Sequence, residues 1–136
     1  MKKTSFISAF VASLFLIVPS SADDTPLAEE MDAMNDAYKA MRRLDDLSKG
    51  PELARTAQDA MVKAIVELPS LVKEMPEGPE KAKAAAEYRK MMGELIATLA
   101  TLELAFLDGD KDKVDEVIKA MRESKKEGHD KFMEDE

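Results

Sequence analysis

The chain has no cysteine and no tryptophan, and it has a single histidine among its 136 residues. The lack of cysteine excludes disulfide bonds and any thiolate-based metal or catalytic site. The sequence also shows no nucleophile–base arrangement, no phosphate-binding loop and no Glu-x-x-His pair of the kind that builds a di-iron site. We therefore expect a protein that is not an enzyme.

Signals for strands are missing as well, because there are no alternating runs of β-branched residues and only 5% of the residues are aromatic. Basic residues are in the minority, and the formal net charge at pH 7 is −8. An acidic surface disfavours nucleic acids and anionic membranes. It favours solubility and docking to basic partner proteins.

The one long apolar run lies at the N-terminus. Residues 1–3 are a short basic start, residues 6–19 are apolar except for two serines, and residues 20–22 offer small side chains to a signal peptidase. This pattern predicts a secretory signal peptide over 1–22, because its apolar part is too short for a membrane span. We expect the mature domain, residues 23–136, to be free in the periplasm, since no lipoprotein cysteine is present. Removal of Lys2 and Lys3 changes the formal charge from −8 to −10.

Glycine and proline divide the mature chain into four amphipathic segments, in which apolar residues recur every three or four positions. Thr25-Pro26 is a typical helix start, and Gly50-Pro51 is expected to end the first helix and to open the second. Pro69 closes the second segment. A proline-rich loop, a third segment over about 80–107, a turn at 108–110 and a fourth segment through Phe132 follow. The sequence thus predicts an all-α fold, an antiparallel up-down-up-down four-helix bundle.

In such a bundle, the first helix begins where the fourth one ends. Met31 and His129 then lie at the same level, each roughly 5–8 Å from that end at about 1.5 Å of rise per residue. At about 100° per residue, His129 is about 60° from Phe132, so we expect it on the apolar side of its helix. A thioether and an imidazole that face each other can fill both axial positions of a haem iron, an arrangement that suits electron transfer.

The sequence MDAMNDAYK, residues 31–39, resembles the first-helix motif of the soluble cytochrome b562 family. In that motif a ligating methionine is followed by Asn-Asp at the fourth and fifth residues after it and by a lysine at the eighth. Residues 129–132 resemble the family's His-x-Lys-aromatic ending, and Tyr88-Arg89 resembles its aromatic-Arg pair early in the third helix. The resemblance covers the whole mature chain.

This resemblance implies a monomeric periplasmic electron-transfer protein with one non-covalent haem b (iron protoporphyrin IX) per chain, docking to basic redox partners. Met31 and His129 would be the axial ligands. The residues implied to pack against the porphyrin are Met34, Tyr88 and Met92, and Lys125 and Lys126 are candidate partners for the propionates. Covalent attachment is excluded, because the two cysteine positions of a Cys-x-x-Cys-His motif are Lys125 and Gly128 here.

Two other functions are considered. Ten methionines in an exported, cysteine-free chain could bind copper(I) through thioethers, although only Met31 and Met34 have the Met-x-x-Met spacing. A haem-free bundle could serve as a chaperone or an interaction module, which predicts an exposed apolar groove. A lone histidine near a helix end is most often a solvated residue. The matching depth of Met31 and the motif around it favour the ligand instead.

Overall fold

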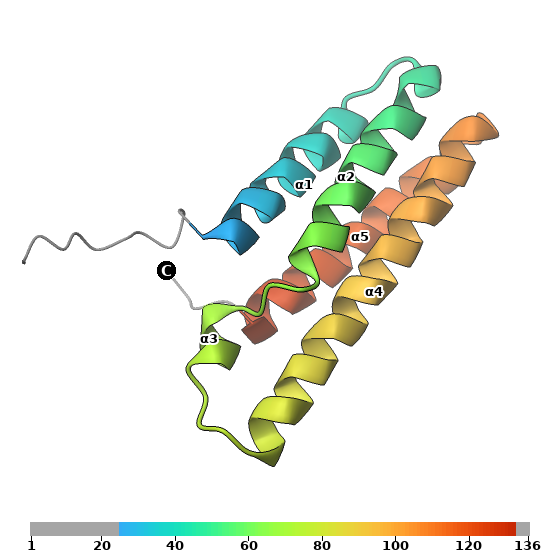
Figure 1. The fold of residues 1–136 in the computed structure, drawn as a ribbon. Coiled ribbons are helices and arrows are strands. Elements are labelled where there is room, and N and C mark those ends of the chain that lie inside the picture. The colour runs from blue at the N-terminus through green and yellow to red at the C-terminus, as the bar shows by residue number, and fades with distance from the viewer. Residues whose placement is uncertain (1–24, 133–136) are drawn as a thin grey trace, which may run out of the picture.

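The computed structural model describes residues 25–132, and within this range every regular element is helical. The prediction of an all-α protein is therefore confirmed. The predicted signal peptide lies outside the described residues. Figure 1 shows the long helices lying alongside one another: α1 (Pro26–Arg42), α2 (Gly50–Ala64), α4 (Pro79–Leu107) and α5 (Lys111–Phe132). Two short elements, η3 (Leu47–Lys49) and α3 (Ser70–Lys73), lie in the connections.

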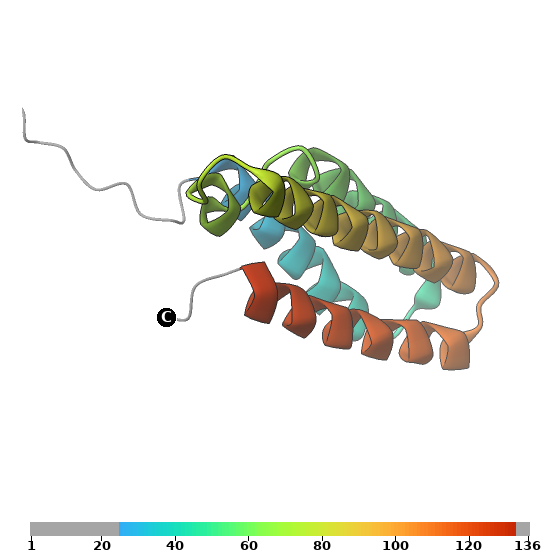
Figure 2. The ribbon, with the colours of Figure 1, turned by 90° about the horizontal axis from the view of Figure 1, so that it is seen from below.

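Helices that follow each other in the chain also pack on each other. α1 packs on α2, α2 on α4, and α4 on α5, whereas α1 and α5 approach each other much less closely. Figure 2 shows the first turns of α1 and the last turns of α5 at the same end of the molecule. No described helix is long and apolar enough to span a membrane.

The predicted helix starts are confirmed. The Thr25 hydroxyl accepts a hydrogen bond from the Ala28 amide at 3.0 Å, and Pro26 occupies the first helical position. Such a cap satisfies one of the amide groups that the first turn leaves without a partner. The turn between α4 and α5 is also as expected, with Gly109 at a positive φ of 67° that favours glycine.

Two helix ends differ from the prediction. The first helix ends at Arg42 rather than at Gly50-Pro51, and the second ends at Ala64 rather than at Pro69. After Arg42 the chain turns inward so that Leu44 and Leu47 pack against the core. The carboxylate of Asp46 then accepts a hydrogen bond from the Ser48 amide at 3.0 Å and caps the short helix η3.

The core consists of the inward faces of the four long helices. Its fully buried large side chains are Met61, Leu99, Leu102 and Met121. Burying a side chain of this size contributes roughly 1.5–3 kcal/mol to stability. None of the described residues that the core buries as a whole is charged, and the core is mainly apolar, with the hydroxyl groups of Tyr38 and Tyr88 as its polar atoms.

Candidate functional site

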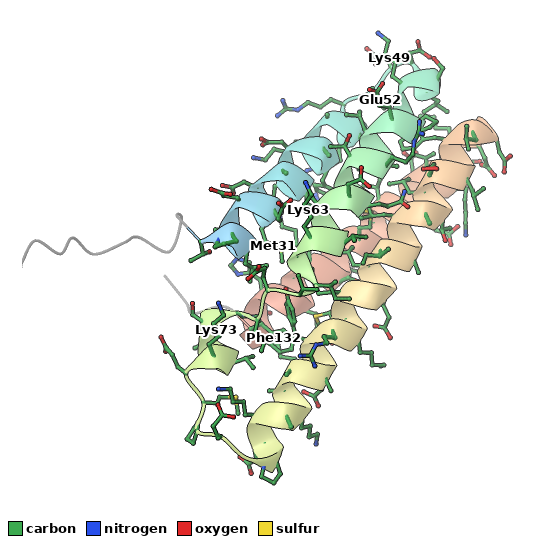
Figure 3. The ribbon with its side chains drawn as sticks, in the orientation of Figure 1. Met31, Lys49, Glu52, Lys63, Lys73 and Phe132 are labelled. Carbon is green, nitrogen blue, oxygen red and sulfur yellow. The ribbon has the colours of Figure 1, made fainter. Side chains whose placement is uncertain are left out.

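The two predicted ligands lie on helices whose ends adjoin. Figure 3 labels Met31 near the start of α1 and Phe132 at the last residue of α5, and both are at the same end of the molecule. His129 is in the last turn of α5, three residues before Phe132. Met31 is partly buried and packs against the core.

The expectation that His129 lies on the apolar side of its helix is wrong, because its side chain is exposed. The inner line of α5 is formed by Val114, Val117, Met121 and Phe132. His129 lies about 60° round the helix from Phe132, which is the edge of this line. Gly128 is turned inward in its place, and a Cβ atom there would lie 3.1 Å from the Met91 sulfur on α4.

A cleft of about 260 Å³ separates the C-terminal half of α1 from the N-terminal half of α5. We call it the α1/α5 cleft. Its α1 wall includes Tyr38 and Arg42, and its α5 wall includes Ile118 and Arg122. The cleft therefore shows which faces of the two helices are turned toward each other.

Met31 and His129 continue the two walls of this cleft. Met31 precedes Tyr38 by seven residues, and His129 follows Arg122 by seven residues. Seven residues make almost two turns, with a drift of only about 20°, so each pair lies on one strip of its helix. The strips lead from the cleft to the end where α1 begins and α5 finishes. The exposed side of α5 that carries His129 is thus the side that faces α1.

The three residues implied to contact a porphyrin are all in the core. Met34, Tyr88 and Met92 are 3%, 2% and 4% exposed. The ring of Tyr88 meets the ring of Phe132 edge to face, with 5.6 Å between the centroids. Tyr88 also donates a hydrogen bond to the Ala64 carbonyl at 2.7 Å. Tyr88 thereby joins α2 and α4 to the turn of α5 that carries His129.

Two polar groups near the predicted ligands have no hydrogen-bond or ion-pair partner among the described residues. The buried Oδ1 atom of Asn35, one turn after Met31, accepts no hydrogen bond within residues 25–132. Lys125, one turn before His129, forms no ion pair with any described carboxylate, and partial burial together with the charge of Lys39 lowers its pKa. Lys126 differs, because it pairs with Asp130 at 3.2 Å.

These residues fit a haem. A thioether and an imidazole are suitable ligands for a haem iron, and Lys125 offers a propionate a cation that has no ion-pair partner among the described residues. Asn35 Oδ1 is not part of this fit, because it accepts hydrogen bonds and ionised propionates also only accept them. Of the two lysines that the sequence offered for the propionates, the structure favours Lys125.

Sequence periodicity did not find the contact between Met91 and Gly128. A glycine within a helix makes the protein about 0.5–1 kcal/mol less stable than an alanine there. Such a glycine therefore often marks a position where another part of the protein approaches the helix backbone closely. Gly128 inside α5 was therefore the one sign in the sequence of such a contact. The structure shows that Met91 covers the side of α5 next to His129.

We expect Tyr88 to make the protein less stable at high pH. Burial, and secondarily the charge of Glu67, raises the pKa of Tyr88 to about 12. An unfolded chain releases the tyrosine proton near pH ~10. Between these values the native state binds more protons than the unfolded state. The free energy of unfolding therefore falls as the pH rises from about 10 to about 12. The stability that Tyr88 contributes is fully present below the pKa of the unfolded chain.

Urea denaturation over this pH range measures the effect, with Tyr88→Phe as the comparison. At neutral pH the free energy of unfolding of the variant should be about 1 kcal/mol lower, because the hydrogen bond from Tyr88 to the Ala64 carbonyl is lost. The variant should then lose less stability than the native protein as the pH rises. Parallel losses in the two proteins would show that other groups cause the decline.

A scan against protein-family models matches the family described as cytochrome b562 over residues 26–133. Searches of curated proteins and of solved structures found no match. The matched range begins with the first residue of α1 and includes both Met31 and His129. Because the match covers most of the chain, the protein belongs to the cytochrome b562 family.

Proposed function

We propose that this protein is a periplasmic electron-transfer cytochrome, an antiparallel up-down-up-down four-helix bundle that binds one non-covalent haem b between Met31 and His129. Its family implies haem binding and electron transfer. The ligand assignment rests on one observation: the helix strips that carry Met31 and His129 are the same strips that form the two walls of the α1/α5 cleft.

The residues have separate roles in this proposal. The Met31 thioether and the His129 imidazole would hold the haem iron, which would leave it no open position for a substrate. The bound haem supplies a reversible one-electron couple, whose potential the methionine ligand raises. Met34, Tyr88 and Met92 provide an apolar surface that keeps water from the porphyrin, and Lys125 offsets the charge of a propionate.

The surface charge supports a role in transfer between proteins. The chain carries a formal charge of −8, or −10 after loss of the proposed signal peptide with Lys2 and Lys3. This field steers the protein toward basic redox partners, and the association slows as salt screens it. The proposal treats the protein as a monomer without enzymatic activity.

Titration of the purified protein with hemin, followed by reduction, tests the proposal. We expect a six-coordinate low-spin spectrum that saturates at one haem per chain. Met31→Leu keeps the volume of the side chain but removes its sulfur. It should still take up haem but give a five-coordinate or water-ligated iron with a lower potential.

Met61→Leu is the matched control, because it makes the same exchange at a fully buried methionine of α2. Its spectrum and potential should equal those of the native protein. An unchanged spectrum in Met31→Leu would remove Met31 from the site. If the native protein takes up no haem, the proposal is wrong, and copper(I) binding or a role as an interaction module has to be tested instead.

A further inference from the structure

The α1/α5 cleft contains residues that the haem proposal does not use. Its lining combines apolar side chains with the guanidinium and ammonium groups of Arg42, Lys119 and Arg122. A fourth cation, Lys111, is neutralised by Asp115 at 2.7 Å. The apolar residues that line the cleft are Tyr38, Met41, Leu44, Leu47, Val114 and Ile118.

The charge of the residues that line the cleft is opposite in sign to the net charge of the protein. Four cations and one carboxylate line the cleft, which leaves a local charge of +3 in a chain of net charge −8. Arg42, Lys119 and Arg122 form no ion pair with any carboxylate among residues 25–132. Unpaired cations beside an apolar wall in an otherwise acidic protein indicate a site for an anion.

The hydroxyl group of Tyr38 is a second and independent sign of a ligand. Tyr38 lines the cleft and is only 6% exposed, and its buried oxygen has no hydrogen-bond partner among the described residues. A phenylalanine would fill the same space without this cost. The free hydroxyl is explained if a ligand in the cleft accepts its hydrogen bond.

The ring of Tyr38 also has two cations near it. Arg42 and Lys125 lie 5.6 and 5.7 Å from its centroid, and each is attracted by the ring. Tyr38 thus lies among positive charges that attract an anion.

The cleft is displaced along the helices from the predicted haem ligands. Ile118 precedes His129 by eleven residues, or about 16 Å at the rise of an α-helix. Tyr38 follows Met31 by seven residues, or about 10 Å. The residues of the cleft therefore lie about two to three helical turns from the pair Met31 and His129.

We propose that the α1/α5 cleft binds a small amphipathic anion, a monocarboxylate with an unbranched alkyl chain. The carboxylate is held by Arg42 and Arg122 and accepts the Tyr38 hydrogen bond, while the alkyl chain lies against Met41, Val114 and Ile118. A volume of about 260 Å³ is below the range of roughly 300–1,000 Å³ that drug-sized ligands occupy. The ligand is accordingly a medium-chain acid rather than a larger molecule.

Calorimetric titration of the purified protein with decanoate, below the concentration at which it forms micelles, tests this. We expect saturable binding at one site, and binding about tenfold weaker in Arg42→Gln and in Arg122→Gln, since each loses a charged hydrogen bond. Arg89→Gln is the matched control, because it removes the same charge from an exposed position on α4 away from the cleft. Its affinity should equal that of the native protein.

Tyr38→Phe separates a ligand-binding role from a structural one. The hydroxyl has no hydrogen-bond partner among residues 25–132, so its removal should raise the midpoint of thermal unfolding. It should also weaken decanoate binding by about fivefold, the value of one hydrogen bond. A variant that is less stable and binds as well as the native protein would show that the hydroxyl serves the fold.

Three further results would overturn the proposal. The first is the absence of saturable binding. The second is equally tight binding of decanol, which has the same alkyl chain and no charge. The third is loss of decanoate binding when one equivalent of hemin is bound, which would mean that decanoate had occupied the haem site. Haem uptake is read separately from its absorption spectrum, so failure here leaves the proposed electron-transfer function untouched.

Discussion

Replacement of His129 by alanine is expected to abolish the low-spin haem spectrum and to leave the helical fold intact. The imidazole is exposed and forms no hydrogen bond or ion pair within residues 25–132. Its loss should therefore change the free energy of unfolding by no more than about 0.5 kcal/mol. As the proposed haem ligand, by contrast, it has no substitute, because it is the only histidine in the chain.

Two measurements on the same sample separate these effects. Circular dichroism during urea denaturation gives the stability, and absorption during hemin titration gives the ligation state. The expected result is a near-native denaturation curve with no six-coordinate low-spin species. A large loss of stability would instead make His129 a structural residue, and an unchanged haem spectrum would make it a solvated one.

A second variant moves the imidazole by one residue. It tests whether the imidazole has to lie on the side of α5 that faces α1. In the double variant His129→Ala/Asp130→His the chain keeps one histidine, but the side chain lies about 100° further round α5. This rotation takes it away from the strip that includes Arg122 and faces α1. The low-spin spectrum should not return, and its return would contradict the argument from the walls of the cleft.

The helices were predictable because their signals are local. Thr25 caps α1 through a hydroxyl that reaches three residues along the chain, and proline at the start of α2 and α4 has the backbone angle that a helix needs. The end of α1 was not predictable in this way. It depends on where Leu44 and Leu47 find the core, and therefore on the position of α2 and α4.

In the candidate site, too, some features follow from local sequence and others depend on packing between helices. The spacing of Met31 and His129 from their helix ends follows from the rise per residue, which local sequence determines. The exposure of His129 depends on the gap between α1 and α5, which pack on other helices rather than on each other. Periodicity places a residue at an angle on its own helix, but it cannot say whether another helix covers that angle.

Replacement of Gly50 by alanine is expected to cost about 2–3 kcal/mol of stability, although the backbone suits alanine. Gly50 has a helical φ of −68°. A Cβ atom there would lie 2.1 Å from the Cδ1 atom of the Phe106 ring, well inside contact distance. The sequence suggested that Gly50 marks a helix boundary. The structure shows in addition that this glycine lets α2 lie directly against an aromatic ring of α4.

Urea denaturation measures this loss, and Gly93→Ala is the matched control. Gly93 lies inside α4, and a Cβ atom there would meet nothing within 4 Å. Alanine should stabilise the protein by about 0.5–1 kcal/mol at that position, because it only restricts the unfolded chain. Opposite signs for the same exchange at two glycines would separate steric contact from helix propensity. Equal signs would rule out the clash with Phe106 as the cause.

The Gly50 substitution also separates the stability of the fold from the chemistry of the site. Figure 3 shows Lys49 and Glu52, the neighbours of Gly50, at the end of the molecule opposite to Met31. A clash at that end reduces the stability of the whole domain, since α2 and α4 share one core with the rest. It does not touch the strips that carry Met31 and His129. The folded Gly50→Ala protein should therefore give the native haem spectrum at a lower unfolding midpoint, whereas His129→Ala should show the reverse.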